Sequence, residues 1–225
     1  MTDNLTHAIE DYLKVVYEIT ATQKRASTNQ IAMILNITPA SVTGMIKKLS
    51  KTNPPLLDHK SHRGVVLTPE GEQIALEVLR HHRLLESFLH QILGYRWDEV
   101  HAEADRLEHV ISEEFEERIA QALGNPSHDP HGDPIPTRDL SMPESPSMKL
   151  SELRIGQCAT IHRVDSEDPE LLRYLSSHGL KPGVDVEIRD HSRFDGNLTI
   201  EIPPNDNAFV LGPSITNQIY IEIFV

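Results

Sequence analysis

Four side chains that suit a metal ion recur along one short stretch of the chain: His101, Asp105, Glu108 and His109. In an α-helix, offsets of four, seven and eight residues place these side chains on one stripe. A separate apolar stripe beside it would face a core and consists of Val100, Leu107, Ile111, Phe115 and Ile119. Two imidazoles and two carboxylates supply the nitrogen and oxygen ligands of a divalent transition ion, and oxygen-rich sets favour the harder ions. The alternative is an ordinary solvated helix face.

A second pair of candidate ligands lies upstream of this stripe. His82 and Glu86 are one helical turn apart in a segment predicted to be helical over residues 69–93. A further helix is predicted over residues 98–123, and the short connection between the two favours an antiparallel hairpin. Such packing would bring His82 and Glu86 against His101.

Length and composition set the broad class of the protein. A chain of 225 residues can bury a substantial core and is long enough for two or three domains. It has no apolar run of the roughly 20 residues that a membrane helix needs, and no secretory signal is expected from the sequence at Met1–Leu5. The lone cysteine, Cys158, excludes an intramolecular disulfide and fits a reducing compartment. These features predict a cytoplasmic protein without a membrane partner.

The net charge of −13 is unevenly distributed along the chain. Residues 1–75 carry eight lysines and arginines against seven acidic residues, whereas residues 76–225 carry thirteen against twenty-seven. Only the N-terminal part can therefore approach phosphate groups without strong repulsion.

This N-terminal part has the pattern of a winged helix-turn-helix. Helices are predicted over residues 7–20, 28–35 and 39–49, and two short strands at 56–59 and 65–68 would flank a basic wing. Small hydroxyl residues at the start of the third helix can enter a major groove, and lysines near its end can reach phosphates. The alternative is a small helical scaffold with a charged surface. The predicted DNA-contacting residues are Thr28, Thr38, Pro39, Ser41, Thr43, Lys47, Lys48 and Arg63.

The C-terminal part changes from helical periodicity to short strands. A Pro-rich linker over residues 124–147 leads to short strands separated by turns, with a short helix at 169–178 after the first strand. The strands are predicted at residues 157–163, 185–189, 197–201, 208–211 and 219–224. This pattern predicts a small SH3-like β-barrel. An acidic cluster of Glu167, Asp168 and Glu170 at the start of that helix either complements the helix dipole or supplies further metal ligands.

The predicted fold class is α+β, with three domains and a linker. A winged helix-turn-helix DNA-binding domain occupies residues 1–75, and a helical, metal-binding hairpin occupies residues 76–123. The linker covers residues 124–147, and the SH3-like β-barrel covers residues 148–225.

At this point the chain resembles a known family along essentially its whole length. The order of domains is similar to that of the diphtheria-toxin-repressor family of metal-dependent transcriptional regulators. This resemblance implies that the hairpin at residues 76–123 is also the dimerisation domain and that the barrel at residues 148–225 is FeoA-like. The segments that carry the resemblance are Glu10–Leu13, Thr38–Thr43, Arg63–Gly71, His82–Glu86, Glu108–His109 and His131–Pro136.

The resemblance implies a homodimer whose metal-loaded form binds a palindromic double-stranded operator and represses metal-uptake genes. It implies a primary metal site of Asp11, Asp105, Glu108 and His109 and an ancillary site of His82, Glu86, His101, Glu167 and Glu170, with Asp168 as a competing ligand. Three carboxylates would repel one another without metal, so the first helix would move. A bound dication would then clamp this helix to the hairpin and set the spacing of the recognition helices.

Two positions depart from particular branches of the family. Iron-responsive members have sulfur ligands where this chain has Asp11 and Asp105, and the change to hard oxygen favours manganese(II). The compact manganese regulators have an acidic residue where this chain has Lys14, and an ammonium group there would repel a second adjacent ion. The resemblance therefore indicates a manganese(II) repressor of the manganese-responsive branch, with separated primary and ancillary sites. Iron(II) remains an alternative cofactor.

Other function classes remain as comparisons. An enzyme is not expected, because the chain has no His-Glu-x-x-His element, Gly-rich phosphate loop or Gly-x-Ser-x-Gly elbow. A metal-independent winged-helix regulator would bind its operator equally well with and without metal. The barrel has few aromatic residues for binding foreign Pro-rich peptides, which favours a role within its own chain.

Overall fold

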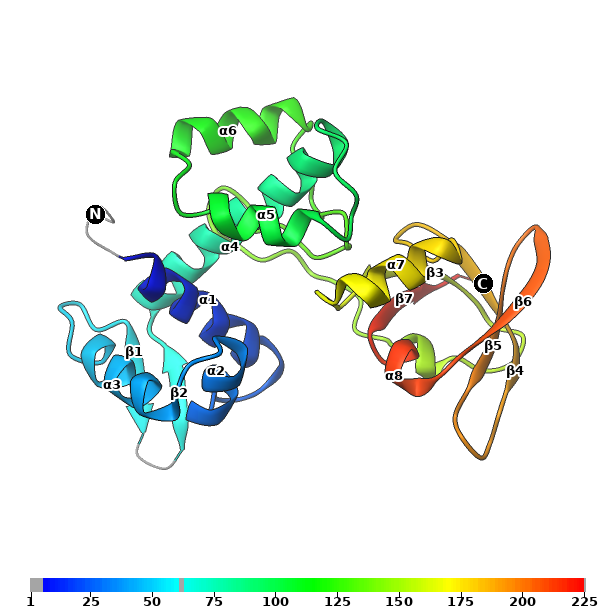
Figure 1. Ribbon diagram of the computed structural model, residues 1–225, viewed down its shortest axis with the longest axis horizontal. Coiled ribbons are helices and arrows are strands. Elements are labelled where there is room, and N and C mark those ends of the chain that lie inside the picture. Colours follow the sequence, from blue (N-terminus) through cyan, green and yellow to red (C-terminus); the bar gives the residue numbers. More distant parts are fainter. Residues whose placement is uncertain (1–5, 61–62, 225) are drawn as a thin grey trace. The chain divides into compact units, whose positions relative to one another are not determined.

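The computed structural model describes residues 6–60 and 63–224. These residues form two compact units (Figure 1). The first unit comprises the chain up to His82 together with residues 107–112 and 136–141. The second comprises residues 83–106, 113–135 and the chain from Met142 onward.

The first unit contains the predicted helix-turn-helix, made of α1 (His7–Thr22), α2 (Thr28–Ile34) and α3 (Pro39–Leu49). Ser27 and Gln30 form a reciprocal capping box at the start of α2. Thr38 caps α3 by accepting a hydrogen bond from the Ser41 amide at 3.2 Å, and Pro39 takes the first helical position. The apolar faces of the three helices share one core with the strands that follow.

A two-stranded antiparallel sheet, β1 (Leu57–Lys60) with β2 (Gly64–Leu67), follows α3 and forms the predicted wing. Ser61 and His62, which were predicted at the basic tip, lie outside the described residues. The start of the next helix is seated tightly against this sheet, because a Cβ at Gly71 would lie 2.1 Å from the backbone oxygen of Leu56. Only glycine permits this close approach.

The region predicted as a helical hairpin contains α4 (Pro69–Gln91), α5 (Val100–Leu107) and α6 (Glu113–Ala122). The prediction of one continuous helix over residues 98–123 was wrong, because the chain leaves helical geometry between α5 and α6. Nδ1 of His81 lies 3.0 Å from the backbone oxygen of Glu108, and this contact satisfies a carbonyl that the break leaves without a helical partner. Glu108 and His109 therefore lie in a turn and not on a helix face. Phe115, predicted to face a core, is exposed.

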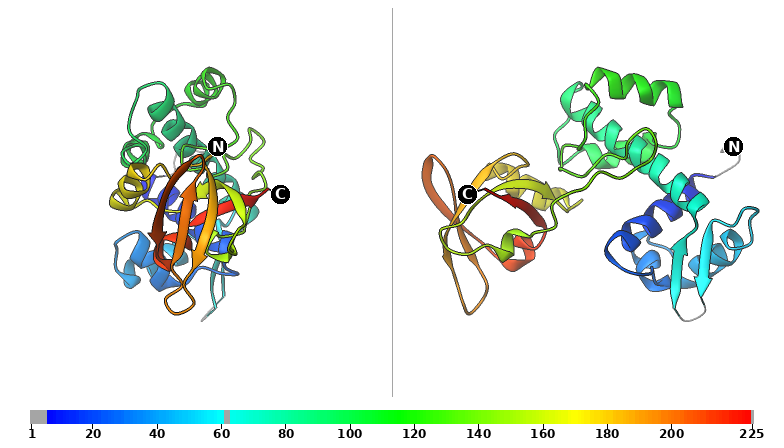
Figure 2. Two further views of the ribbon diagram at one scale, coloured as in Figure 1. Left: turned by 90° about the vertical axis from the view of Figure 1, so that its right-hand side faces the viewer. Right: turned by 180° about the vertical axis from the view of Figure 1, so that it is seen from behind.

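The C-terminal part of the second unit is a five-stranded antiparallel sheet in the order β6-β5-β4-β3-β7 (Figure 2). Its strands are β3 (Cys158–Val164), β4 (Asp185–His191), β5 (Leu198–Ile202), β6 (Asn205–Leu211) and β7 (Ile219–Ile223). Helices α7 (Pro169–Ser177) and α8 (Pro213–Thr216) and the short 3-10 turn η1 (Leu150–Glu152) accompany it. Because β6 and β7 remain at the edges of the order, the sheet is SH3-like but not a closed barrel among the described strands.

The α+β fold class is confirmed, with this change from a closed barrel to an open SH3-like sheet.

The segment before α5 packs against the C-terminal domain. Trp97 belongs to the apolar core of that domain, and Asp98 lies 3.2 Å from Arg173 of α7. In the segment 124–147, Asp129, His131 and Ile135 are buried. None of the helices in the described part of the chain is both long and apolar enough to cross a membrane.

Candidate metal centres

The first cluster of possible ligands surrounds His109 and lies within the first unit. Nε2 of His109 is 2.6 Å from Oδ1 of Asp11, which projects from α1. Nδ1 of the same ring is 2.7 Å from Oε2 of Glu10, so a carboxylate lies against each nitrogen. Burial alone would lower the pKa of His109, but the hydrogen bond to Asp11 and the nearby carboxylates outweigh burial and raise it. In this geometry the imidazole is protonated and holds both acids.

Glu108 completes the group of three, with one ligand atom each from Asp11, Glu108 and His109 within 4.8 Å of the others. Its carboxylate is almost fully buried, and Oε2 lies 2.5 Å from Nδ1 of His82. The ammonium of Lys14 lies 3.0 and 2.9 Å from its two oxygens. Burial raises the pKa of Glu108, yet the hydrogen bond from His82 and the charge of Lys14 hold it below its ordinary value. Glu108 is therefore ionised, as a metal ligand must be.

Asp105 is the fourth residue that the resemblance assigns to this site. It lies on α5 with its side chain 47% exposed, and its Oδ2 is 3.5 Å from Nε2 of His101. The structure thus groups three of the four predicted primary ligands around His109. Asp105 is not in that group, but its ligand atom lies within 4.8 Å of those of His82 and Glu108, so it shares Glu108 with the first cluster and His82 with the second.

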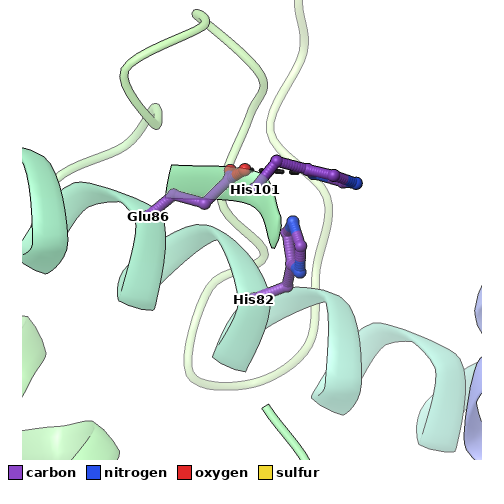
Figure 3. A group of neighbouring side chains, drawn as sticks. All are labelled: His82, Glu86 and His101. Carbon is purple, nitrogen blue, oxygen red and sulfur yellow. Dashed lines mark hydrogen bonds and ion pairs between the residues drawn. The ribbon is translucent and has the colours of Figure 1, made fainter. Parts of the chain in front are cut away.

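The second cluster contains His82, Glu86 and His101, whose ligand atoms also lie within 4.8 Å of one another (Figure 3). His82 and Glu86 project from successive turns of α4, as their spacing of four predicts. Oε1 of Glu86 is 3.2 Å from Nδ1 of His101. Both His82 and Glu86 are buried, whereas His101 is partly exposed.

His101 is surrounded by acids in the same way as His109. Oε2 of Glu167 lies 3.4 Å from its Nε2, in addition to the contact with Glu86 at Nδ1. Although burial lowers the pKa of His101, hydrogen bonds to Glu167 and Glu86 raise it to about 10. A metal ion at either cluster would therefore replace a proton, which fits ligands that bind divalent ions in deprotonated form.

The acidic residues at the start of α7 make different contacts. Asp168 is the N-cap of α7, because its Oδ1 accepts a hydrogen bond from the Glu170 amide at 2.9 Å. Glu167 instead faces His101. Glu170 is exposed in the first turn of α7. Of these three acids, Glu167 lies beside the predicted ancillary ligands.

The residues present fit a divalent transition ion at both clusters. Each cluster combines imidazole nitrogen with carboxylate oxygen and includes a buried carboxylate that is costly to leave without a cation. None of the three residues in either cluster supplies sulfur. The donor set is hard and anionic.

Comparisons with known proteins cover nearly the whole chain. The iron dependent repressor N-terminal DNA binding domain matches residues 4–65, and the iron dependent repressor metal binding and dimerisation domain matches residues 68–137. A FeoA domain matches residues 148–223. The iron-dependent repressor IdeR of Mycobacterium leprae is 31% identical over 218 residues, which cover 92% of this chain and 93% of that protein. The chain belongs to the iron-dependent repressor family.

Other similar proteins include a toxin repressor and repressors named for manganese. The diphtheria toxin repressor of Corynebacterium diphtheriae is 29% identical over 210 residues, or 88% of this chain and 89% of that protein. A solved manganese-dependent transcriptional repressor in complex with manganese has a TM-score of 0.88 at 36% identity, covering 96% of this chain and 100% of that one. The manganese regulator SloR has a TM-score of 0.78 at 33% identity, covering 96% and 98%. The predicted resemblance is confirmed, and the chain is a metal-dependent transcriptional repressor of this family.

The candidate DNA-binding face of the repressor lies on α3. Thr38, Pro39, Ser41, Thr43, Lys47 and Lys48 are exposed, and Thr28 is partly exposed at the start of α2. The hydroxyl of Thr43 donates to the Pro39 carbonyl at 2.9 Å, and those of Thr38 and Ser41 lie 3.0 Å apart. A Cβ at Gly44 would meet nothing within 4 Å, so the middle of this face is open. Arg63 is exposed beside the wing turn.

Two residues of the repressor's first helix were not assigned to its metal site from the sequence. Glu10 holds Nδ1 of His109, and Lys14 binds Glu108. Their neighbours lie 99 and 94 residues away along the chain, so no local pattern could indicate these contacts. For Lys14 the signals were the family resemblance and its spacing of three residues from Asp11 on α1. Helical spacing gave no such signal for Glu10, which is adjacent to Asp11 in the sequence.

Proposed function

We propose that this repressor is activated by manganese(II) and then binds a palindromic operator as a homodimer. The observation that carries the proposal is the 2.6 Å contact between Asp11 of α1 and His109 of the turn after α5. One partner belongs to the segment matched by the DNA-binding domain and the other to the segment matched by the metal binding and dimerisation domain. A metal site here would tie the position of the DNA-binding helix to metal availability.

From the sequence, the acids of the first cluster are expected to repel one another in the absence of metal. In the structure, positively charged side chains lie between these acids. The protonated ring of His109 already offsets part of the negative charge of Asp11 and Glu10, and Lys14 neutralises Glu108. Asp11, Glu108 and Nε2 of His109 would hold the dication, which would supply a stronger positive charge than the proton that it replaces. Asp11 would then hold α1 through coordination and no longer through a hydrogen bond that deprotonation can remove. Glu10 keeps Nδ1 of the ring oriented in both states.

We propose a second, ancillary metal ion at the second cluster, where His82, Glu86, His101 and Glu167 would hold it. Glu167 lies beside the FeoA domain's first helix, so a metal ion here would join His101 to the C-terminal domain. On the strength of the resemblance we include Asp105 in the primary set and Glu170 in the ancillary set. A coupling of about 1–3 kcal/mol per site suffices for a working switch.

Manganese(II) is favoured over iron(II) because the donor atoms are carboxylate oxygens and imidazole nitrogens, without sulfur among the grouped residues. The manganese repressor at 36% identity supports the same choice. Relatives named as iron-dependent make iron(II) the competing cofactor. Because a repressor acts on DNA, the proposal also places the protein in the cytoplasm.

The test is fluorescence anisotropy of chelator-treated protein on DNA from upstream of its own gene and of neighbouring transporter genes. Manganese(II) and, anaerobically, iron(II) are titrated at fixed ionic strength, because phosphate contacts make affinity depend on salt. We expect binding that requires metal and that manganese(II) induces at the lower free concentration. Stronger induction by iron(II) would reject the assignment of manganese. Equal binding in chelator would show a metal-independent regulator.

A further inference from the structure

Lys14 occupies an unusual position for a lysine. Its side chain projects from α1 into the first metal cluster and is only 10% exposed. Lysine is almost never fully buried unless it is paired, because removing an ammonium from water is costly. Lys14 must therefore have a specific partner, and the contacts identify it as Glu108.

The two Lys14 contacts with Glu108 use both oxygens of the carboxylate, at 2.9 and 3.0 Å. Nζ also lies 3.2 Å from Nδ1 of His82. Each carboxylate oxygen can accept about two hydrogen bonds, so these contacts occupy a large part of the capacity of Glu108. Oε1, which lies 3.4 Å from Nε2 of His109, is the oxygen nearest to the remaining ligands of the cluster.

A dication bound to Oε1 of Glu108 would share that oxygen with the ammonium. Like charges attached to one buried oxygen repel strongly, because little water lies between them. The carboxylate of Glu108 can thus be neutralised fully by Lys14 or by metal, and each weakens the other. Exposed lysines have no such effect, since solvent screens them.

We propose that the ammonium of Lys14 is a built-in competitor of the metal ion for Glu108 and sets the free metal concentration to which the repressor responds. The inference rests on the proposed function, because it assumes that Glu108 is a metal ligand. In the metal-free protein Lys14 acts as the counter-ion of Glu108 and holds α1 to the turn after α5. It is a positioning and tuning residue, and it makes the site weaker than its ligands alone would be.

The test compares Lys14→Met with wild type by direct manganese(II) titration, with free ion followed by electron paramagnetic resonance at fixed pH. Methionine keeps the length and the apolar stem and removes the charge. We expect manganese(II) to bind at least tenfold more tightly and the melting temperature of the metal-free protein to fall. If Lys14 had only a structural role, the substitution would lower both the manganese(II) affinity and the melting temperature. Lys24→Met, at an exposed position just after α1, is the matched control and should change neither.

The outcomes separate this inference from the proposed function. A wild-type protein that binds no manganese(II) would refute the proposed cofactor. A folded Lys14→Met protein that binds with equal or weaker affinity would overturn the competition while leaving the function intact. Counting bound ions in the same titration distinguishes tighter binding at the original site, which supports the proposal, from gain of an additional ion alone, which rejects it.

A second variant, Lys14→Gln, keeps a hydrogen-bond donor and is used if methionine prevents folding. If both variants fold only with manganese(II), the counter-ion role is supported, because metal then replaces the missing charge. If neither folds under any condition, Lys14 is a structural counter-ion and the competition is rejected.

Discussion

Replacing Glu10 by glutamine tests how the first cluster orients its imidazole. Glu10 accepts a hydrogen bond from Nδ1 of His109 at 2.7 Å, and its side chain is 16% exposed. Glutamine can keep this hydrogen bond through its amide oxygen but removes the negative charge. We therefore expect metal binding to weaken without loss of the fold.

The magnitude follows from the charge balance. Below the raised pKa of His109, a dication held at Nε2 would displace a proton, so the site would gain one net positive charge. That charge would be separated from the Glu10 carboxylate by the imidazole ring and the 2.7 Å contact at Nδ1, a distance of roughly 6 Å. At an effective dielectric constant of about 20, that interaction is worth about 2.8 kcal/mol, and screening by solvent reduces it to about 1.4 kcal/mol. The expected loss of manganese(II) affinity is therefore about 10- to 100-fold, the usual effect of changing the partner of a metal-binding histidine.

The assay is a manganese(II) titration of Glu10→Gln and wild type at pH 7, with melting curves of both metal-free proteins. Glu72→Gln, an exposed acid in the first turn of α4, is the control and should bind like wild type. Unchanged affinity in Glu10→Gln, within a factor of two, would refute the reasoning. It would mean that Glu10 contacts the ring of His109 without affecting its affinity for manganese(II).

Three further predictions follow from the same geometry. Asp11→Ala should abolish most metal-activated operator binding in anisotropy while leaving dimerisation nearly intact in analytical ultracentrifugation, and equal damage to both would contradict the clamp. Because the pKa of His109 is raised, the ring is protonated below that pKa and a metal ion must displace the proton. Manganese(II) affinity should therefore fall as the pH is lowered through the raised pKa, approaching about tenfold per pH unit below it, and a flat profile would exclude proton displacement at this ring. Gly44→Ala should stabilise α3 by about 0.5–1 kcal/mol in denaturant unfolding, since its Cβ has open space, and an unchanged operator affinity would show that no DNA backbone lies close to this position.

The parts of the fold that local sequence specifies were predicted well. Capping by Ser27 and Thr38, with Pro39 at the first position of α3, marks helix starts within a few residues. Alternating apolar residues placed all seven strands close to their observed bounds. These signals are short-range, and the structure follows them.

The break between α5 and α6 could not be predicted in the same way. Residues 108–112 contain neither glycine nor proline, and the apolar periodicity continues through them. What stabilises the break is a contact from His81, 27 residues away, to the freed carbonyl of Glu108. Tertiary contacts of this kind decide local structure without leaving a local pattern. The contacts of Glu10 and Lys14 with the cluster belong to the same class.

Two adjacent histidines of α4 contact different parts of one glutamate. His81 contacts the backbone oxygen of Glu108, and His82 contacts its carboxylate. The same helix begins at the wing, where Gly71 leaves no room between its backbone and Leu56. About ten residues of rigid helix, or roughly 15 Å, separate these two fixed points. The first half of α4 therefore connects Glu108 to the start of the wing as one rigid segment. If Glu108 shifted when a metal ion replaced Lys14 as its partner, this segment would carry the shift to the wing.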